Sequence, residues 1–373
     1  MDIRGAGAGF RENNFDLLRI FAASQVMVSH AIAHLDIAPR GGGWPMTLLY
    51  AFPGVPIFFV ISGFLISASY ERSTSLGSYC RNRVLRIFPG LWCCILATVV
   101  VAACCGFGFM HRGAFVWLAA QLAGAIYTPA FLAHFGMGSY NGSLWTIPVE
   151  LQFYIALPLV YWLLSAGRGW ISGRLILVWA IFVAVGLAAS GLAAVPGEGM
   201  AEPLPHKLLR YSFLPQFFLF MTGVVMQRYR LHEARWIAGK GLWWLAAYLA
   251  CVCLMPASSV AHVPATLLLG VVAVSMAYTA PRTAQRWLRG NDISYGVYIY
   301  HGLLINLFLE WGLAGSARLL AWLIACTYLI GYLSWVMIER PFLRRKRQTI
   351  SPTIAATAPP PDAVRAGAGL AET

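Results

Sequence analysis

The sequence is poor in charged residues, and acidic side chains are the scarcer kind. Charged residues make up 11% of the 373 residues, whereas a soluble domain of ordinary composition carries about 25%. Apolar residues make up 59%, and the mean hydropathy is +0.67. So few charges cannot provide a polar surface for a water-soluble fold of this length, and the apolar content is too high for a disordered chain. The composition therefore excludes a soluble enzyme and a disordered protein, and it indicates a membrane protein.

Cysteines with metal-ligand or disulfide-framework spacing are also missing. The chain has eight cysteines, but none belongs to a CxxC pair and most lie in apolar runs. Such spacing supports neither a structural zinc site nor a disulfide-stapled secreted domain. We interpret the cysteines as small packing residues and predict no metal site. A convincing internal repeat is absent too, which weakens, without excluding, a transporter built from inverted repeats.

Long apolar runs are the main feature that the sequence does contain. A hydrocarbon core about 30 Å thick is crossed by roughly 20 helical residues. The first run is long and has no small-residue cleavage site, so we interpret it as a span rather than a signal peptide. The pattern predicts an all-α, polytopic membrane bundle of about ten transmembrane helices, near residues 16–35, 50–70, 88–110, 145–165, 171–194, 211–228, 241–257, 262–281, 293–313 and 317–338.

The basic residues set the predicted topology. The chain has 27 Lys and Arg against 14 Asp and Glu. This excess is typical of cytoplasmic loops in membrane proteins, so we expect no nucleic-acid partner. With ten spans and both termini cytoplasmic, 22 of the 27 basic residues lie inside, whereas an eleventh span at 114–134 would leave only 10 inside. We therefore predict that 114–134 is an interfacial or re-entrant segment at the outer face.

Three regions follow from this topology. Residues 1–14 are predicted to be a cytoplasmic N-terminal segment, and residues 15–345 the transmembrane domain. Residues 348–373 are rich in Ala and Pro and lack periodicity, so they are predicted to be a disordered cytoplasmic tail.

Ionisable residues within the spans are candidate functional groups, because a charge at a span centre costs about 2.5–3.5 kcal/mol on insertion scales. Arg19 and His30 are eleven positions apart, which places them on one helix face and about 16 Å apart along the axis. Arg19 then lies near the cytoplasmic surface and His30 in the outer half. Glu150 enters the fourth span at a similar depth to His30, which predicts an acid–base or orienting pair. A snorkelling Arg19, a structural His30 and an ion-paired Glu150 remain alternatives.

Four further residues have two readings each. Arg83 and Arg86, three positions apart on the inner side, either bind phosphate or follow the positive-inside rule, and spacing alone favours the second. Ser62 either allows close helix packing or contacts an acceptor, and Trp145 either anchors the outer interface or stacks on a sugar. Asp292, at the start of the ninth span, is interpreted as a helix cap.

Six stretches together resemble acyltransferase family 3, the polytopic membrane O-acyltransferases that act on sugars and related acceptors. The resemblance covers about residues 13–345, and the stretches follow the family's order from the first span to the last. They are FDLLRIFAASQVMVSHAIAH with its Arg19-x10-His30 spacing, FFVISGFLI, RNRVLRIFP, SLWTIPVELQFY, DISYGVYIYH and IERPF. In the fifth stretch His301 is followed by Gly302 and Leu303, where the family commonly has Pro, and we assign His301 no role.

The resemblance implies an O-acyltransferase that moves an acyl group, expected to be acetyl, from cytoplasmic acyl-CoA to a hydroxyl of a surface or exported polysaccharide or another glycosylated acceptor. It also implies a multi-pass protein of the bacterial inner membrane, with acyl-CoA as co-substrate and no tightly bound cofactor. The candidate residues are His30 and Glu150 for catalysis, Arg19, Arg83 and Arg86 for acyl-CoA binding, and Trp145 and Ser62 on the acceptor side.

In this hypothesis the guanidinium groups bind the CoA phosphates, and His30 acts as general base or as transient acyl carrier. Glu150 would orient His30 or balance its charge. The alternative function is a transporter or flippase of a lipid-linked sugar, in which intramembrane His and Glu relay protons.

Overall fold

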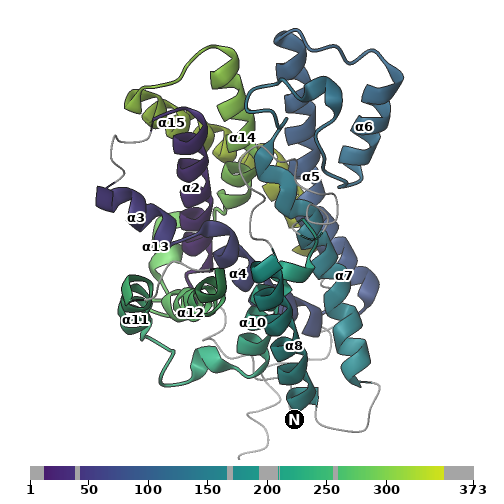
Figure 1. The fold of residues 1–373 in the computed structure, drawn as a ribbon. Coiled ribbons are helices and arrows are strands. Elements are labelled where there is room, and N and C mark those ends of the chain that lie inside the picture. The colour runs from purple at the N-terminus through teal and green to yellow at the C-terminus, as the bar shows by residue number, and fades with distance from the viewer. Residues whose placement is uncertain are drawn as a thin grey trace, which may run out of the picture.

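The computed structural model describes residues 12–37, 43–165, 171–192, 209, 211–254 and 259–347. Within these residues all regular structure is helical (Figure 1), which confirms the predicted all-α class. The predicted disordered tail, 348–373, lies outside the described residues, as does most of the segment 1–14.

A helix overlaps each of the ten predicted spans. These helices are α2 (Phe15–His34), α4 (Gly54–Glu71), α5 (Leu76–Cys104), α7 (Thr146–Ser165), α8 (Ile171–Leu192), α10 (Phe217–Arg228), α11 (Gly241–Leu254), α12 (Ser259–Ala277), α14 (Ser294–Glu310) and α15 (Ala317–Ser334). Five segments of the described chain are long and apolar enough to cross a membrane, namely Phe15–His34, Gly43–Glu71, Leu76–Cys104, Gly142–Ser165 and Ala317–Arg345. The protein is therefore a membrane protein, and the count of ten spans stays a prediction.

Short elements connect these helices. They are α3 (Gly43–Ala51), α6 (Arg112–Leu122), η2 (Ala130–Leu132), η3 (Gly142–Trp145), η4 (Leu214–Gln216), η5 (Leu231–Glu233), α13 (Thr283–Leu288), the π-helical turn η6 (Trp335–Glu339) and α16 (Arg340–Arg347). The weak run 114–134 forms most of α6, a loop and the short helix η2, and α6 lies beside α5 (Figure 1). At 1.5 Å per residue, the 11 residues of α6 extend about 16 Å, which is too short to cross the hydrocarbon core.

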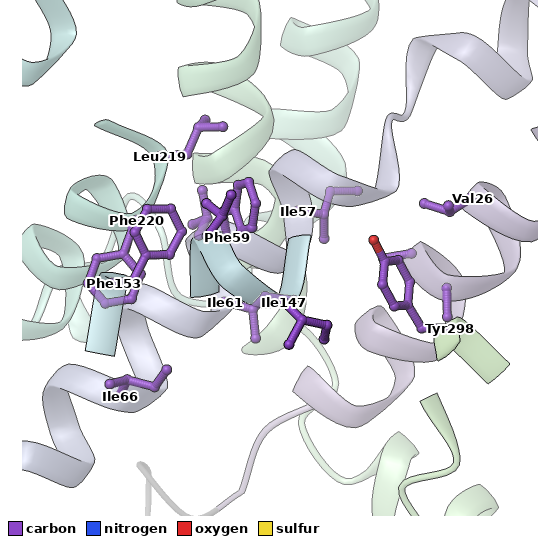
Figure 2. Close-up of a cluster of buried hydrophobic side chains, with 14 of the residues drawn as sticks. Val26, Ile57, Phe59, Ile61, Ile66, Ile147, Phe153, Leu219, Phe220 and Tyr298 are labelled. Carbon is purple, nitrogen blue, oxygen red and sulfur yellow. The ribbon is translucent and has the colours of Figure 1, made fainter. Parts of the chain in front are cut away.

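Helix α4 lies at the centre of the fold, against α2, α7, α10 and α12 (Figure 1). Figure 2 shows the apolar cluster around it, where Phe59, Phe153 and Phe220 meet. The ring centroids of Phe59 and Phe153 are 5.0 Å apart, and those of Phe153 and Phe220 are 4.8 Å apart. Such aromatic pairs fix the helices at short range, and Phe59 of α4 also borders the cavity described below.

Two glycines allow α4 and α10 to approach closely. A Cβ on Gly63 of α4 would overlap the carbonyl oxygen of Phe220, and a Cβ on Gly223 of α10 would overlap that of Val60. Small residues at a helix interface permit this backbone contact in a membrane, where packing replaces the hydrophobic effect.

The first prediction tests this contact. Gly63→Ala forces α4 and α10 apart and is expected to destabilise the fold by about 1–3 kcal/mol, the usual range for overpacking. Gly173→Ala on α8 is the matched control, because nothing lies within 4 Å of the position of its new Cβ. The measurement is thermal unfolding in detergent. Equal midpoints for the two variants would show that the α4–α10 contact does not limit stability.

Candidate active site

A cavity of about 640 Å³ lies between α2, α4, α5, α7 and the start of α14. Its volume is within the range of small-molecule sites, roughly 300–1,000 Å³. The charged side chains of its wall are Asp16, Arg19, Arg72, Arg83, Arg86, Glu150 and Asp292, and its main apolar ones are Val55, Phe58, Phe59, Leu65, Ile66 and Ile147. Phe59 and Ile147 of this wall also belong to the apolar cluster drawn in Figure 2. The cavity thus combines a polyionic region with an apolar one.

One buried carboxylate joins two of the predicted arginines. Oδ2 of Asp292 accepts hydrogen bonds from Arg86 at 2.5 Å and from Arg19 at 3.2 Å. The Asp292 side chain is only 9% exposed, and those of Arg19 and Arg86 are 21% and 22% exposed. Arg19 also contacts Asp16 at 3.4 Å. Residues from α2, α5 and the start of α14 therefore meet at a single anion.

The second oxygen of Asp292 fixes the beginning of α14. Oδ1 accepts from the Ser294 hydroxyl at 2.5 Å and from the Ser294 backbone N–H at 3.3 Å. The N-cap residue of α14 is Ile293, so Asp292 lies one position before the predicted cap and instead binds the first residue of the helix. The same side chain also holds the arginine pair, a function that its sequence position did not reveal.

Arg83 also lines the cavity, where it lies against two aromatic rings. It donates to Ser69 at 3.0 Å, and its guanidinium carbon is 5.7 Å from the ring centroid of Tyr154 and 5.9 Å from that of Tyr79. These distances permit cation–π attraction. Its buried Nε has no hydrogen-bond partner among the described residues. A cation held by rings and left with a donor unused is well suited to bind an anionic ligand.

Glu150 faces the same cavity. Its carboxylate accepts hydrogen bonds from the Tyr154 hydroxyl and, at 3.4 Å, from Ser62. The structure therefore brings Glu150, Ser62 and the three predicted arginines to one cavity. Trp145 is not part of the described cavity wall, and its ring packs against Tyr211 with centroids 5.8 Å apart.

His30 is half-buried and lies outside the cavity wall, next to α14. Its Nδ1 is 3.1 Å from Nε2 of His301, which is fully buried. Among the described residues, hydrogen bonds join His30 to His301 and Glu150 to Tyr154, but none joins His30 to Glu150. Tyr298 connects the two regions, because it lines the cavity and its ring centroid is 5.8 Å from that of His301.

Comparison with known proteins identifies the chain. Residues 12–338 match the family described as Acyltransferase domain. The chain belongs to acyltransferase family 3. It is accordingly an O-acyltransferase, and the predicted family and enzyme class are confirmed.

Relatives of this acyltransferase carry names from several contexts. It is 34% identical to Nodulation protein 10 of Rhizobium leguminosarum bv. viciae, over 91% of this chain and 95% of that protein. It is 28% identical to the O-acetyl transferase of Shigella phage Sf6, over 91% of this chain and 99% of that protein. It is 27% identical to the exopolysaccharide production protein ExoZ of Rhizobium meliloti, over 79% of this chain and 90% of that protein. No solved structure matches it.

Sequence reasoning about the acyltransferase missed Asp292 as an arginine partner and assigned nothing to His301, Tyr154 or Tyr298. The signal for Tyr154 was available, because it follows Glu150 by four residues and therefore shares its helix face. Tyr298 and His301 are likewise three residues apart on one face. For Asp292 no local signal exists, since its arginine partners are 206 and 273 positions away.

The second prediction concerns Asp292 of the acyltransferase. Asp292→Asn removes the shared anion and leaves two largely buried guanidinium groups facing each other. Breaking a fully buried pair costs about 3–5 kcal/mol, and partial exposure of the arginines should reduce this loss to roughly the lower end. Asp16→Asn is the control, because its contact with Arg19 is longer, at 3.4 Å, and 43% exposed on the Asp16 side. Thermal unfolding should show the larger loss for Asp292→Asn, and the reverse order would contradict the assignment.

Proposed function

We propose that this enzyme transfers an acyl group, acetyl in the first instance, from cytoplasmic acyl-CoA to a hydroxyl group of a surface or exported polysaccharide or another glycosylated acceptor. The observation that carries the proposal is the cavity in which Arg19, Arg83 and Arg86 meet an apolar lining. Two relatives have names that mention O-acetyl transfer and exopolysaccharide production, which supports the acyl group and the acceptor class.

The donor would bind with its phosphates at the guanidinium groups. Planar guanidinium forks match phosphate oxygens in two parallel hydrogen bonds. The unused Nε of Arg83 offers one donor, and the pair on Asp292 offers the N–H groups that Asp292 does not occupy. The apolar wall then suits the pantetheine arm, which has few charges to solvate.

We further propose ten spans, with both termini cytoplasmic, in the bacterial inner membrane. Arg19, near the beginning of α2, pairs with Asp292, just before α14. His30, further along α2, pairs with His301, further along α14. The two helices therefore run parallel, which requires an odd number of membrane spans between them in the sequence. The ten-span topology has seven, and an added span at 114–134 would make eight. This topology also puts the arginines on the side where acyl-CoA is found.

The proposed reaction is direct acyl transfer. The acceptor oxygen forms a bond to the acyl carbon of the thioester, the carbon–sulfur bond breaks, and CoA leaves as a thiolate. His30 takes the proton of the acceptor hydroxyl, a role worth about 10²–10⁴-fold in rate. Glu150, within the donor cavity, stays a candidate catalytic residue through its bonds to Tyr154 and Ser62 rather than through contact with His30.

The third prediction tests the donor site. Arg83→Ala should weaken acyl-CoA binding by about 10- to 100-fold, because a hydrogen bond to a charged group contributes roughly 1.5–3 kcal/mol. Arg81→Ala is the matched control, since Arg81 lies on the same helix, is exposed and is not part of the described cavity wall. Calorimetric titration of the detergent-solubilised enzyme measures both. Equal acyl-CoA affinity in Arg83→Ala and wild type would show that Arg83 does not bind the donor and only follows the positive-inside rule.

The fourth prediction tests the base. His30→Ala should lower kcat by about 10²–10⁴-fold while donor affinity stays within a factor of two or so, because His30 lies outside the cavity wall. His34→Ala, four residues further on and exposed, should retain near wild-type turnover. The assay is acceptor-dependent release of free CoA thiol. A flippase would move its substrate without consuming the thioester, so absence of this release in wild type would favour transport, and full turnover in His30→Ala would remove His30 as the base.

A further inference from the structure

His301 is a buried histidine that the donor cavity does not use. It lies on α14 with no exposed surface, and its ring is enclosed by His30 and Tyr298, at centroid separations of 5.2 Å and 5.8 Å. Its two ring nitrogens both have partners. Nδ1 is 3.3 Å from the carbonyl oxygen of Val297, and Nε2 is 3.1 Å from Nδ1 of His30.

For two neutral rings, these two contacts determine where the protons are. A carbonyl oxygen can only accept a hydrogen bond, so Nδ1 of His301 carries the proton that reaches Val297. A neutral imidazole has one N–H, so Nε2 of His301 is an acceptor. Nδ1 of His30 must then be the donor in the bond between the rings. The only nitrogen of the pair left with a free lone pair is Nε2 of His30.

The geometry points to His301 as the positioning residue that holds His30 in the tautomer in which Nε2 is the base. This inference rests on the proposed function, since it assigns a partner to the base of the acyl transfer. His301 does not touch the reacting atoms in this arrangement. It orients the ring of His30 through one hydrogen bond, as the second ring nitrogen of a functional histidine is commonly oriented by a fixed acceptor.

The chain of bonds also accommodates the proton that the reaction releases. When the acceptor hydroxyl attacks the thioester, its proton moves to Nε2 of His30, and the ring becomes an imidazolium with both nitrogens protonated. Nδ1–H of His30 continues to donate to Nε2 of His301, so the positively charged ring of His30 keeps its hydrogen-bond acceptor. The proton then passes from Nε2 to the departing CoA thiolate, which restores the neutral pair and balances the reaction.

His301 can do this because its environment is rigid. It lies on α14, whose start is held by Asp292 through bonds to Ser294, Arg19 and Arg86. On the next residue, Gly302, a Cβ would overlap Oδ1 of Asn141, so α14 lies in direct contact with the segment before α7. His34 is the other histidine beside His30, with a ring centroid separation of 6.1 Å, and no hydrogen bond between these two rings is found in the described structure.

The fifth prediction compares two replacements of His301. His301→Gln places an amide oxygen near the former Nε2 and can accept from His30, whereas His301→Met has a similar length and no comparable acceptor. The His301→Met variant should lower kcat by about 10- to 100-fold, the range typical when a metal-bound histidine loses the partner that orients it. The His301→Gln variant should keep most of the wild-type kcat. KM for acyl-CoA should change little in either, because the arginine side chains remain in place.

The outcomes separate positioning from packing. Equal kcat losses for glutamine and methionine, or an unchanged kcat for methionine, would overturn the inference. If methionine fails to fold, ¹⁵N NMR of wild-type enzyme labelled in histidine decides instead, with His30→Ala used to assign the His30 signal. Protonated Nδ1 and unprotonated Nε2 are expected for His30, and the opposite tautomer would overturn the inference. A His30→Ala enzyme with full turnover would instead refute the proposed base, whatever the tautomer.

Discussion

The bond network at Asp292 is the constraint on which the candidate site depends. Three chain segments far apart in sequence bring two guanidinium groups and a helix start to one carboxylate. Each of these charges would be costly in a membrane protein if left alone, and one carboxylate pairs with both guanidinium groups while leaving an excess positive charge in the cavity. The stability of this junction therefore fixes both the arginine end of the cavity and the position from which α14 begins.

From this junction α2 and α14 extend side by side in the same direction (Figure 1). His30 follows Arg19 by eleven residues on α2, and His301 follows Asp292 by nine on the other side. At 1.5 Å per residue both intervals are about 14–16 Å, so the two helices meet again at the histidines. The separation between arginines and histidines is thus set by helix geometry, and it does not depend on any flexible loop.

The sequence predicted those parts of this arrangement that depend on one helix at a time. Apolar length placed a helix at each of the ten runs, and helical periodicity placed Arg19 and His30 on one face of α2. The expected depth of Glu150 stays a prediction, and depth along a helix says nothing about which neighbour the side chain faces. Glu150 points to Tyr154 on its own helix and to Ser62 on α4. The distant partners of His30 and Arg19 were beyond prediction for the same reason, since His301 on α14 and Asp292 just before it are more than 270 positions away.

The separation of the two ends has a chemical consequence. A guanidinium close to a catalytic imidazole would disfavour its protonated form, since two positive charges repel strongly where the dielectric constant is low. A carboxylate in contact with the imidazole would favour that form, which makes the imidazole a stronger base but makes the imidazolium slower to release its proton. The structure keeps the Asp292 arginines at one end of α2 and gives His30 a second imidazole, rather than a carboxylate, as its partner at the other. A neutral acceptor orients the ring and leaves its affinity for the proton to be set by the surrounding protein, which suits a group that must take up a proton and release it again in each turnover.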